Sequence, residues 1–427
     1  MNLLLHSPFT IHHSQLRLTG SKSETNRLLL LQALYPNIIL ENTSNSDDSE
    51  VMIKALHSQF TIHNSQLIHV HHAGTAMRFL TAYFAIQEGK EVVLTGSSRM
   101  KERPIKILVE ALKQLGAEIF YEEKEGFPPL KIIGKKLTQN QVSLPANVSS
   151  QYISALLLIA PKLENGLQLT LEGEITSMPY INMTLGLLKE IGVETSFVGN
   201  KIIVKPKFTI HNSQFTIESD WSSASYFYSI VALSEVGTQI QLSSYKQNGL
   251  QGDSVLAEIY QRFGVETTFN DDNSITISKV NYPQVTTHTR AKGELSEANL
   301  QLNNAPDIAQ TIAVTCFGLG IGCHLTGLHT LKIKETDRLE ALKTELSKLG
   351  AIITVTNDSL TLEPSPANFA IARNVAIATY QDHRMAMAFA PLALKTSLII
   401  EDAEVVSKSY PSFWEDLKNI GFQFSEV

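Results

Sequence analysis

Cationic side chains recur beside Gly, Ser and Thr along a chain that is acidic as a whole. They lie in the segments 21–27, 73–78, 99–104, 334–338 and 382–387, and Lys408 follows the last of these. Small residues let backbone N–H groups approach an anion that a neighbouring cation already attracts. The pattern therefore predicts a site for small, highly charged anions.

Composition limits the classes of protein that could carry such a site. The chain has 427 residues and a net charge of −7, so we expect two or three domains and no nucleic-acid partner, which would need a broad basic face. No stretch reaches the roughly 18 apolar residues of a membrane span, and the N-terminal apolar run is too short for a signal peptide. The two cysteines, Cys316 and Cys323, favour a reducing cytoplasm and are expected to be structural thiols.

An internal repeat indicates the domain organisation. An amphipathic helix that ends at glycine and leads into a strand recurs about every 70–85 residues, at Gly116, Gly192, Gly264, Gly350 and Gly421. A degenerate sixth copy without its glycine begins at residue 51. Six α/β units predict two domains of three units each, with the chain passing between domains near residues 218–220.

A second repeat, Phe-Thr-Ile-His-x-Ser-Gln, occurs at 9–15, 60–66 and 208–214. Its copies are unevenly spaced, so we interpret them as inserted, neutral sequence at strand ends or loops. A metal reading of His69, His71 and His72 is not favoured, because no Cys or carboxylate with ligand spacing stands beside them.

Three of the cationic segments precede or open predicted helices, and each has a simpler reading. The hydroxyls beside Lys22 and Arg27 are either helix caps or part of an anion site at a helix N-terminus. Gly74 and Thr75 either allow close helix packing or hold a carboxylate or phosphate. The charges at 99–103 either form a solvated loop or face a ligand, and Pro104 is expected as a first helical residue.

Two carboxylates could perform acid–base chemistry near these cations. Asp307 starts an apolar helix and either satisfies the helix dipole or acts as a general base. Glu335 is either part of a surface charge cluster or an acid/base whose pKa is tuned by Lys334 and Arg338. Arg384 follows a histidine that could belong to the core, and it could itself face an anion.

The motifs at 21–27, 73–78, 99–104, 334–338 and 382–387 together resemble the enolpyruvyl transferases over nearly the whole chain. The resemblance implies a two-domain inside-out α/β barrel, in which each domain has three repeated βαβαββ-type units and the active site lies in the interdomain cleft. One domain is expected to comprise residues 1–18 and 219–427, and the other residues 19–218.

The resemblance also implies a reaction. Phosphoenolpyruvate would donate its enolpyruvyl group to the 5-hydroxyl of shikimate 3-phosphate through a tetrahedral intermediate, with release of phosphate. Such an enzyme would serve chorismate and aromatic amino acid biosynthesis in the cytoplasm and be a target of glyphosate. It would need no cofactor or metal, bind only its two small substrates, have no nucleic-acid or membrane partner, and act as a monomer.

The site residues implied by the resemblance fall into three sets. Asp307 would take the hydroxyl proton, Glu335 would protonate the methylene carbon, and Lys22 would complete the catalytic set. Shikimate 3-phosphate would be held by Lys22, Ser23, Arg27, Ser149, Ser150, Gln151, Ser177, Tyr180, Asp307 and Lys334. Phosphoenolpyruvate would be held by Lys22, Gly74, Arg103, Arg338, Arg384 and Lys408.

Three positions depart from the family pattern: His72 stands in place of Asn, Phe79 in place of Pro, and Thr330 in place of Asn. The near alternative is transfer to UDP-N-acetylglucosamine, but the reactive Cys of that relative is missing from the 99–103 region. A non-catalytic anion-binding protein of the same fold is the alternative from another class, and a turnover assay separates it from an enzyme.

Overall fold

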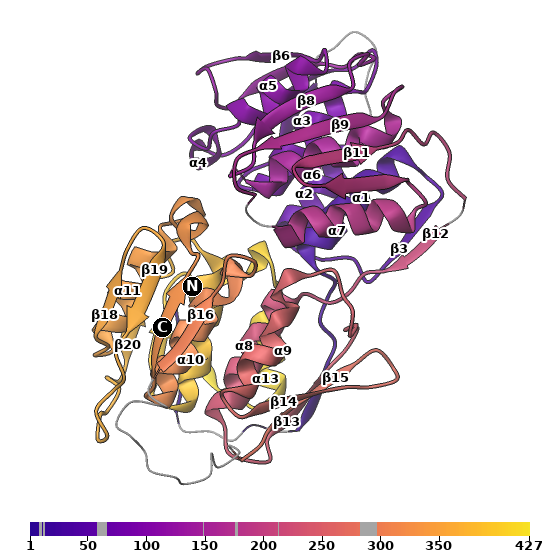
Figure 1. Ribbon diagram of the computed structural model, residues 1–427. Coiled ribbons are helices and arrows are strands. Elements are labelled where there is room, and N and C mark those ends of the chain that lie inside the picture. Colours follow the sequence, from indigo (N-terminus) through magenta and orange to yellow (C-terminus); the bar gives the residue numbers. More distant parts are fainter. Residues whose placement is uncertain are drawn as a thin grey trace. The chain divides into compact units, whose positions relative to one another are not determined.

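The computed structural model describes residues 1–7, 11, 13–57, 66–147, 149–175, 178–211, 213–281 and 297–427 (Figure 1). The chain forms two compact units. Unit 1 combines Met1–Thr19 with Glu218–Val427, and unit 2 is the continuous segment Gly20–Ile217. Unit 1 is therefore assembled from both ends of the chain.

Unit 2 contains both helices and strands. In chain order they are α1 (Lys22–Leu34), β3 (Ile38–Glu41), α2 (Asp47–Leu56), β4 (Gln66–His69), α3 (Gly74–Ala85), β5 (Glu91–Thr95), α4 (Ser98–Lys101), α5 (Lys106–Gln114), β6 (Glu118–Tyr121), β7 (Leu130–Ile133), β8 (Gln141–Pro145), α6 (Ser150–Ile159), η1 (Ala160–Lys162), β9 (Leu167–Glu172), α7 (Met178–Glu190), β10 (Thr195–Val198), β11 (Lys201–Val204) and β12 (Ser213–Thr216).

Unit 1 begins with two N-terminal strands, β1 (Leu3–Leu5) and β2 (Ser14–Leu16). After unit 2 it continues with α8 (Trp221–Leu233), β13 (Gln239–Leu242), η2 (Gly252–Val255), α9 (Leu256–Gln261), β14 (Val265–Phe269), β15 (Ile275–Lys279), β16 (Glu297–Gln301), η3 (Pro306–Ile308), α10 (Ala309–Leu319), β17 (Gly322–Thr326), η4 (His329–Ile333), α11 (Arg338–Lys348), β18 (Ile353–Val355), β19 (Ser359–Leu362), β20 (Val375–Ile377), α12 (His383–Phe389), η5 (Ala390–Leu394), β21 (Leu398–Ile400), η6 (Ala403–Lys408), α13 (Phe413–Asn419) and β22 (Phe424–Glu426).

Among the described residues, five four-stranded sheets share one pattern of strand pairing. In each, two strands run parallel and the other two extend the sheet with antiparallel neighbours, as in β8–β9–β11–β10 of unit 2 and β16–β17–β19–β18 of unit 1. In the sheets that begin with β4, β8 and β16, a helix joins the two parallel strands and a second helix leads to the antiparallel pair, so the repeat is βαβαββ. The parallel strands β2 and β13 are instead separated by the whole of unit 2. The sixth sheet has only the parallel pair β3 and β12, and the described strands form no closed barrel.

The predicted glycine ends of the helices are confirmed. Gly116 follows α5 with φ 100° and Gly350 follows α11 with φ 99°, and the same left-handed backbone occurs at Gly192, Gly264 and Gly421. A residue with a side chain is strained at such a φ, whereas glycine is not. Each of these glycines turns the chain from a helix into the next strand of its unit.

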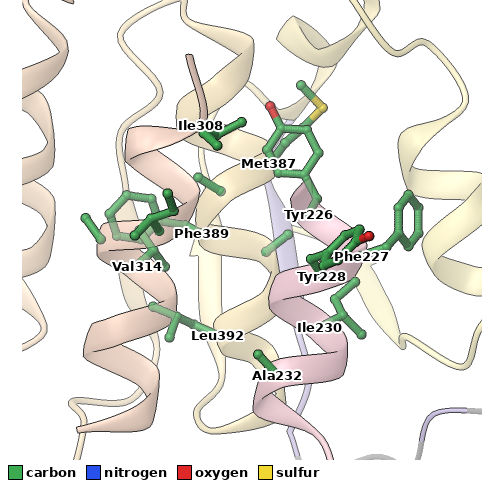
Figure 2. Packing of buried hydrophobic residues seen from close by; sticks show 14 of the residues in the cluster. Tyr226, Phe227, Tyr228, Ile230, Ala232, Ile308, Val314, Met387, Phe389 and Leu392 are labelled. Carbon is green, nitrogen blue, oxygen red and sulfur yellow. The ribbon is translucent and has the colours of Figure 1, made fainter. Parts of the chain in front are cut away.

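Buried helices form the core of each unit. In unit 1 every residue of α8 is buried, and α8 packs against α10, which packs against α12. Figure 2 shows Ile230 of α8, Val314 of α10 and Phe389 of α12 in this core. Each such side chain contributes about 1.5–3 kcal/mol through burial. In unit 2 the contacts among α1, α3 and α6 play the same part.

Two local expectations had different outcomes. The described ends of the Phe-Thr-Ile-His-x-Ser-Gln copies lead into strands β2, β4 and β12, as interpreted, although residues 8–10, 12, 58–65 and 212 lie outside the described part. The expectation that Pro104 is a first helical residue was wrong. Helix α5 begins at Lys106, and the carbonyl of Pro104 instead accepts hydrogen bonds from Arg78 and Tyr152.

Candidate functional site

Polar residues at the starts of three buried helices contact one another in unit 1. Asp382 caps α12, Asp307 precedes α10, and Ser222 lies in the first turn of α8. Arg384 joins them: Nη1 donates to the Asp307 carbonyl at 3.2 Å, and Nη2 donates to Ser222 Oγ at 3.3 Å. The positive ends of these helix dipoles therefore add to the potential that the side-chain cations create.

Arg338 is the centre of this group, with a side chain only 2% exposed. Its Nε donates to Asp382 at 2.6 Å, Nη1 to Asp307 at 2.9 Å and Nη2 to Glu335 at 2.8 Å. Burial alone would lower the pKa of Arg338, but the three carboxylates together raise it above its usual value. One guanidinium thus fixes the positions of both predicted acid–base carboxylates.

Glu335 also pairs with Lys408, whose Nζ lies 2.7 Å from Oε1. Burial would raise the pKa of Glu335, yet Arg338 and Lys408 hold it well below its usual value. Sequence reasoning named Lys334 with Arg338 as the tuning cations. The structure instead places Lys334 Nζ 3.5 Å from Asp307, because Glu335 and Lys334 are neighbours in the chain whose side chains reach different partners.

Asp307 is surrounded by cations. Besides Arg338 and Lys334, Arg384 lies 3.5 Å from Oδ2. Burial would lower the pKa of Arg384, but Asp307, together with Tyr226, Asp253 and Asp220, raises it well above its usual value. The group of Lys334, Arg338, Arg384 and Lys408 around Asp307 and Glu335 can hold an anionic ligand beside two carboxylates.

In unit 2 the start of α3 lies against Arg103. A methyl group built at Gly74 would lie 2.6 Å from Arg103 Nη1, so only glycine leaves room for the guanidinium there. The buried Arg78 ties the two segments together, because it donates to the carbonyls of Gly74 and Pro104. Burial and the neighbouring Arg103 lower the pKa of Arg78 to about 10.

The start of α6 joins the same region. Gln151 Nε2 donates to Thr75 Oγ1 at 3.1 Å, and the Tyr152 hydroxyl donates to the carbonyl of Pro104 at 2.6 Å. Ser149 caps α6 by accepting from the Gln151 N–H, and Ser150 is buried. The structure therefore brings Gly74, Arg103 and residues 149–151 close together.

Lys22 and Arg27 lie on α1 but differ in exposure. Lys22 is partly exposed, and its Nζ lies 3.5 Å from the buried Asp48. Arg27 is buried, which lowers its pKa to about 10, and it donates to Thr184 Oγ1, Ser154 Oγ and the carbonyl of Ser23. Lys22 can thus reach a ligand, whereas most of the Arg27 donors already bind the protein.

The remaining positions are two further predicted ligands and two residues that differ from the family pattern. Tyr180 is half-buried on α7 beside Arg27, and Ser177 lies outside the described residues. Phe79 is buried with its ring 5.4 Å from the Arg27 guanidinium, and Thr330 Oγ1 is buried without a hydrogen-bond partner among the described residues. Within the same part of the chain, no group of three His, Cys, Asp or Glu residues could hold a metal ion.

Sequence reasoning gave no role to several residues that organise the site, including Arg78, Asp48 and Ser222. Arg78 and Asp48 fill their positions through contacts with segments far away in the sequence. Asp382 belongs to the motif at 382–387, but its contact with Arg338 was not predicted, because the two residues lie 44 positions apart in the chain. A local pattern carries no signal for such pairs.

The cations clustered around Asp307 and Glu335 form a site suited to small anionic ligands. Residues 12–417 match the model of the EPSP synthase (3-phosphoshikimate 1-carboxyvinyltransferase) family. The chain belongs to this family. It transfers the enolpyruvyl group of phosphoenolpyruvate to the 5-hydroxyl of shikimate 3-phosphate and releases phosphate, a step in aromatic amino acid biosynthesis.

Relatives match over nearly their full lengths. A 3-phosphoshikimate 1-carboxyvinyltransferase of Bacteroides fragilis is 46% identical over 424 residues, covering 99% of this chain and 98% of the relative. One of Vibrio campbellii is 35% identical over 443 residues, covering 98% and 99%. The solved EPSP synthase of Acinetobacter baumannii has the same fold, with a TM-score of 0.78 at 21% identity and 100% of both chains covered. UDP-N-acetylglucosamine is not favoured as the acceptor.

None of the described helices has the length and apolar character needed to cross a membrane.

Proposed function

We propose that Asp307 and Glu335 are the catalytic base and acid of this transfer, and that the cations around them bind phosphoenolpyruvate. The observation that carries this proposal is the single buried Arg338, which holds both carboxylates at 2.8–2.9 Å. Arg384 and Lys408 each pair with one carboxylate at the edge of the group. Arginine offers the planar, bidentate geometry that phosphate and carboxylate groups require.

Asp307 takes the proton of the 5-hydroxyl. Its carboxylate lies within 3.5 Å of Lys334, Arg338 and Arg384, so both carboxylate oxygens face cations at the place where the hydroxyl proton would be taken up. The deprotonated oxygen then attacks C2 of phosphoenolpyruvate. The same cations stabilise the negative charge on the phosphate and carboxylate of the tetrahedral intermediate.

Glu335 delivers a proton to the methylene carbon in the first step and takes one back when phosphate leaves. Its pKa is well below the usual range because Arg338 and Lys408 stabilise the carboxylate. A bound anion competes for these cations, so substrate binding raises the pKa of Glu335 toward that of a proton donor. Binding of phosphoenolpyruvate therefore favours the protonated form of Glu335, which is the form that can donate a proton.

The proposed substrate ligands fall into two sets. Lys22, Gly74 and Arg103 of unit 2 are proposed for phosphoenolpyruvate, as are Arg338, Arg384 and Lys408 of unit 1, and Lys22 is also proposed to be catalytic. The residues proposed for shikimate 3-phosphate are Lys22, Ser23, Arg27, Ser149, Ser150, Gln151, Ser177, Tyr180, Asp307 and Lys334. Because Arg27 is buried in contacts with Thr184 and Ser154, its main effect is to position Ser23 and Tyr180.

Phosphate release in the presence of both substrates tests the assignment. Asp307→Asn and Glu335→Gln should lower kcat at least 100-fold while shikimate 3-phosphate still binds, since general acid–base groups contribute about 10²–10⁴-fold. Glu340→Gln, an exposed change in the first turn of α11, is the matched control and should keep full activity. Full activity of either site variant would contradict the roles given to Asp307 and Glu335.

We further propose that the enzyme acts in the cytoplasm as a monomer, with no cofactor and with only its two substrates as partners. Two reduced, buried cysteines agree with a reducing compartment. Activity that tracks a single monomeric peak in gel filtration and survives a chelator supports this proposal. Activity confined to a dimer peak, or lost with the chelator and restored by a divalent ion, contradicts it.

A further inference from the structure

Behind Arg384, on the side of α8, lies a buried pair that the reaction does not use directly. Ser222 Oγ accepts a hydrogen bond from Arg384 Nη2 at 3.3 Å and donates its own hydrogen to Asp253 Oδ2. Ser222 is 9% exposed and Asp253 is 7% exposed. The three residues belong to α8, η2 and α12, so this chain of contacts joins separate elements of unit 1.

The direction of these hydrogen bonds follows from the groups involved. A guanidinium can only donate, whereas a serine hydroxyl both donates and accepts. The hydroxyl can accept a hydrogen bond from Arg384 only while its own hydrogen points elsewhere. That hydrogen points to Asp253, whose carboxylate accepts a hydrogen bond from the hydroxyl. Asp253 therefore fixes the hydroxyl in the orientation that Arg384 needs.

We infer that Ser222, oriented by Asp253, is a positioning residue that aims the Arg384 guanidinium at phosphoenolpyruvate. The inference rests on the proposed role of Arg384 as a ligand of that substrate. Arg384 has two other anchors, the carbonyl and the carboxylate of Asp307. Because the carboxylate moves protons in the reaction, Ser222 and the Asp307 carbonyl are the neutral anchors, and Ser222 is the one from another element that keeps the guanidinium in place while the Asp307 side chain changes charge.

The protonation of Asp253 depends on the charged groups that face it. Asp307 from η3, Arg384 from α12 and Asp220 at the cap of α8 all act on it. Burial, then the charge of Asp307, raises the pKa of Asp253 to about 7. A neutral Asp253 no longer needs the serine hydrogen, so the orientation of Ser222 should change between about pH 6 and pH 8.

The first experiment replaces Ser222. Ser222→Ala should raise KM for phosphoenolpyruvate roughly tenfold, the usual effect of losing one hydrogen bond to a charged group, and change KM for shikimate 3-phosphate less than about twofold. Ser222→Thr keeps the hydroxyl and should restore the lower KM. Ser229→Ala removes another buried hydroxyl of α8, one that accepts from Thr315 at 2.7 Å, and should leave both KM values unchanged. Equal kinetics of wild type and Ser222→Ala would overturn the inference.

A double-mutant cycle separates this inference from the proposed function. Arg384→Ala should raise KM for phosphoenolpyruvate strongly, and adding Ser222→Ala to it should cause no further loss. If the two losses add, Ser222 does not act through Arg384 and the inference fails while the proposed function stands. If Arg384→Ala leaves this KM unchanged, the proposed ligand role of Arg384 fails instead.

Asp253→Asn tests the charge. The ratio of kcat/KM for phosphoenolpyruvate in wild type and variant cancels the titration of the substrate itself. We expect this ratio to be constant in acid, where Asp253 is neutral like asparagine, and to change above about pH 7. A ratio that stays flat from about pH 5.5 to 8.5 would show that the charge of Asp253 does not reach Arg384.

Discussion

The contact between Gly74 and Arg103 gives a prediction whose size follows from the structure. In Gly74→Ala the new methyl group would lie 2.6 Å from Nη1 and 2.9 Å from Nη2 of Arg103. Non-bonded heavy atoms prefer separations of about 3.5–4.0 Å, so the guanidinium must retreat by roughly 1 Å. Because it is the far end of a flexible side chain, the retreat costs little folding stability but misplaces the group.

A misplacement of about 1 Å in a site can cost on the order of 100-fold in rate. We therefore expect Gly74→Ala to lower kcat/KM for phosphoenolpyruvate roughly 10- to 100-fold, with KM for shikimate 3-phosphate nearly unchanged. Glyphosate should compete with phosphoenolpyruvate, as the family resemblance implies, and its inhibition constant should rise in the variant. Steady-state kinetics with each substrate varied in turn measures all three quantities.

The control for Gly74→Ala is the same change in an Arg103→Ala background. The three atoms nearest to the new methyl group all belong to the Arg103 guanidinium, so the double variant should behave like Arg103→Ala alone. A further 10-fold loss in the double variant would refute the steric reasoning. An unchanged glyphosate inhibition constant in Gly74→Ala would mean that Gly74 does not line the pocket.

Three other predictions concern stability, pH and thiol chemistry. Arg338→Met leaves the carboxylates of Asp307, Glu335 and Asp382 without their shared cation, and it should lower the free energy of unfolding by about 3–5 kcal/mol in urea titrations at neutral pH; an unchanged midpoint would contradict this. Folding lowers the pKa of Glu335, so its ionised form stabilises the protein at pH values above its unfolded-state pKa of 4.5, and this stabilisation is lost as the pH falls through the folded-state pKa. The difference in unfolding free energy between wild type and Glu335→Gln should therefore shrink below about pH 4. A difference that stays constant with pH would refute this prediction. The hydrogen bond with Cys323, and then burial, raises the pKa of Cys316 well above its usual value, and both thiols are buried. Iodoacetamide should therefore modify neither thiol in the native enzyme. Mass spectrometry that detects modification before unfolding would contradict this prediction.

Local sequence patterns predicted much of the fold. The helix ends at Gly116 and Gly350 could be predicted because a left-handed residue after the last turn strongly favours glycine. The helix starts near Lys22 and Gly74 were predicted from the hydroxyl and small residues beside them, although neither Ser21 nor Ala73 makes a side-chain cap hydrogen bond. By contrast, α4 is four residues long and carries no periodicity, so the segment before Pro104 was not expected to contain a helix.

The site was predictable as a set of motifs but not as a set of contacts. Arg338, Glu335 and Lys408 were each predicted as site residues, but their pairing was not, because Lys408 and Glu335 lie 73 positions apart in the chain. Such pairs form because tertiary packing brings helix starts together, and no local spacing encodes that packing. For the same reason Ser222 and Asp253, which stand in no charged motif, went unrecognised.

The position of β1 has a consequence for how the chain folds during synthesis. Leu3–Leu5 lie between β21 and β22, with Leu3 opposite Ile400 on one side and Glu426 on the other. Unit 2 is continuous and can fold as soon as residue 217 has left the ribosome, but β1 must wait for almost the entire chain. Until then both edges of this apolar strand are open to wrong partners. Removing the last few residues, which include β22, should therefore lower the yield of folded enzyme more than its rate per folded molecule.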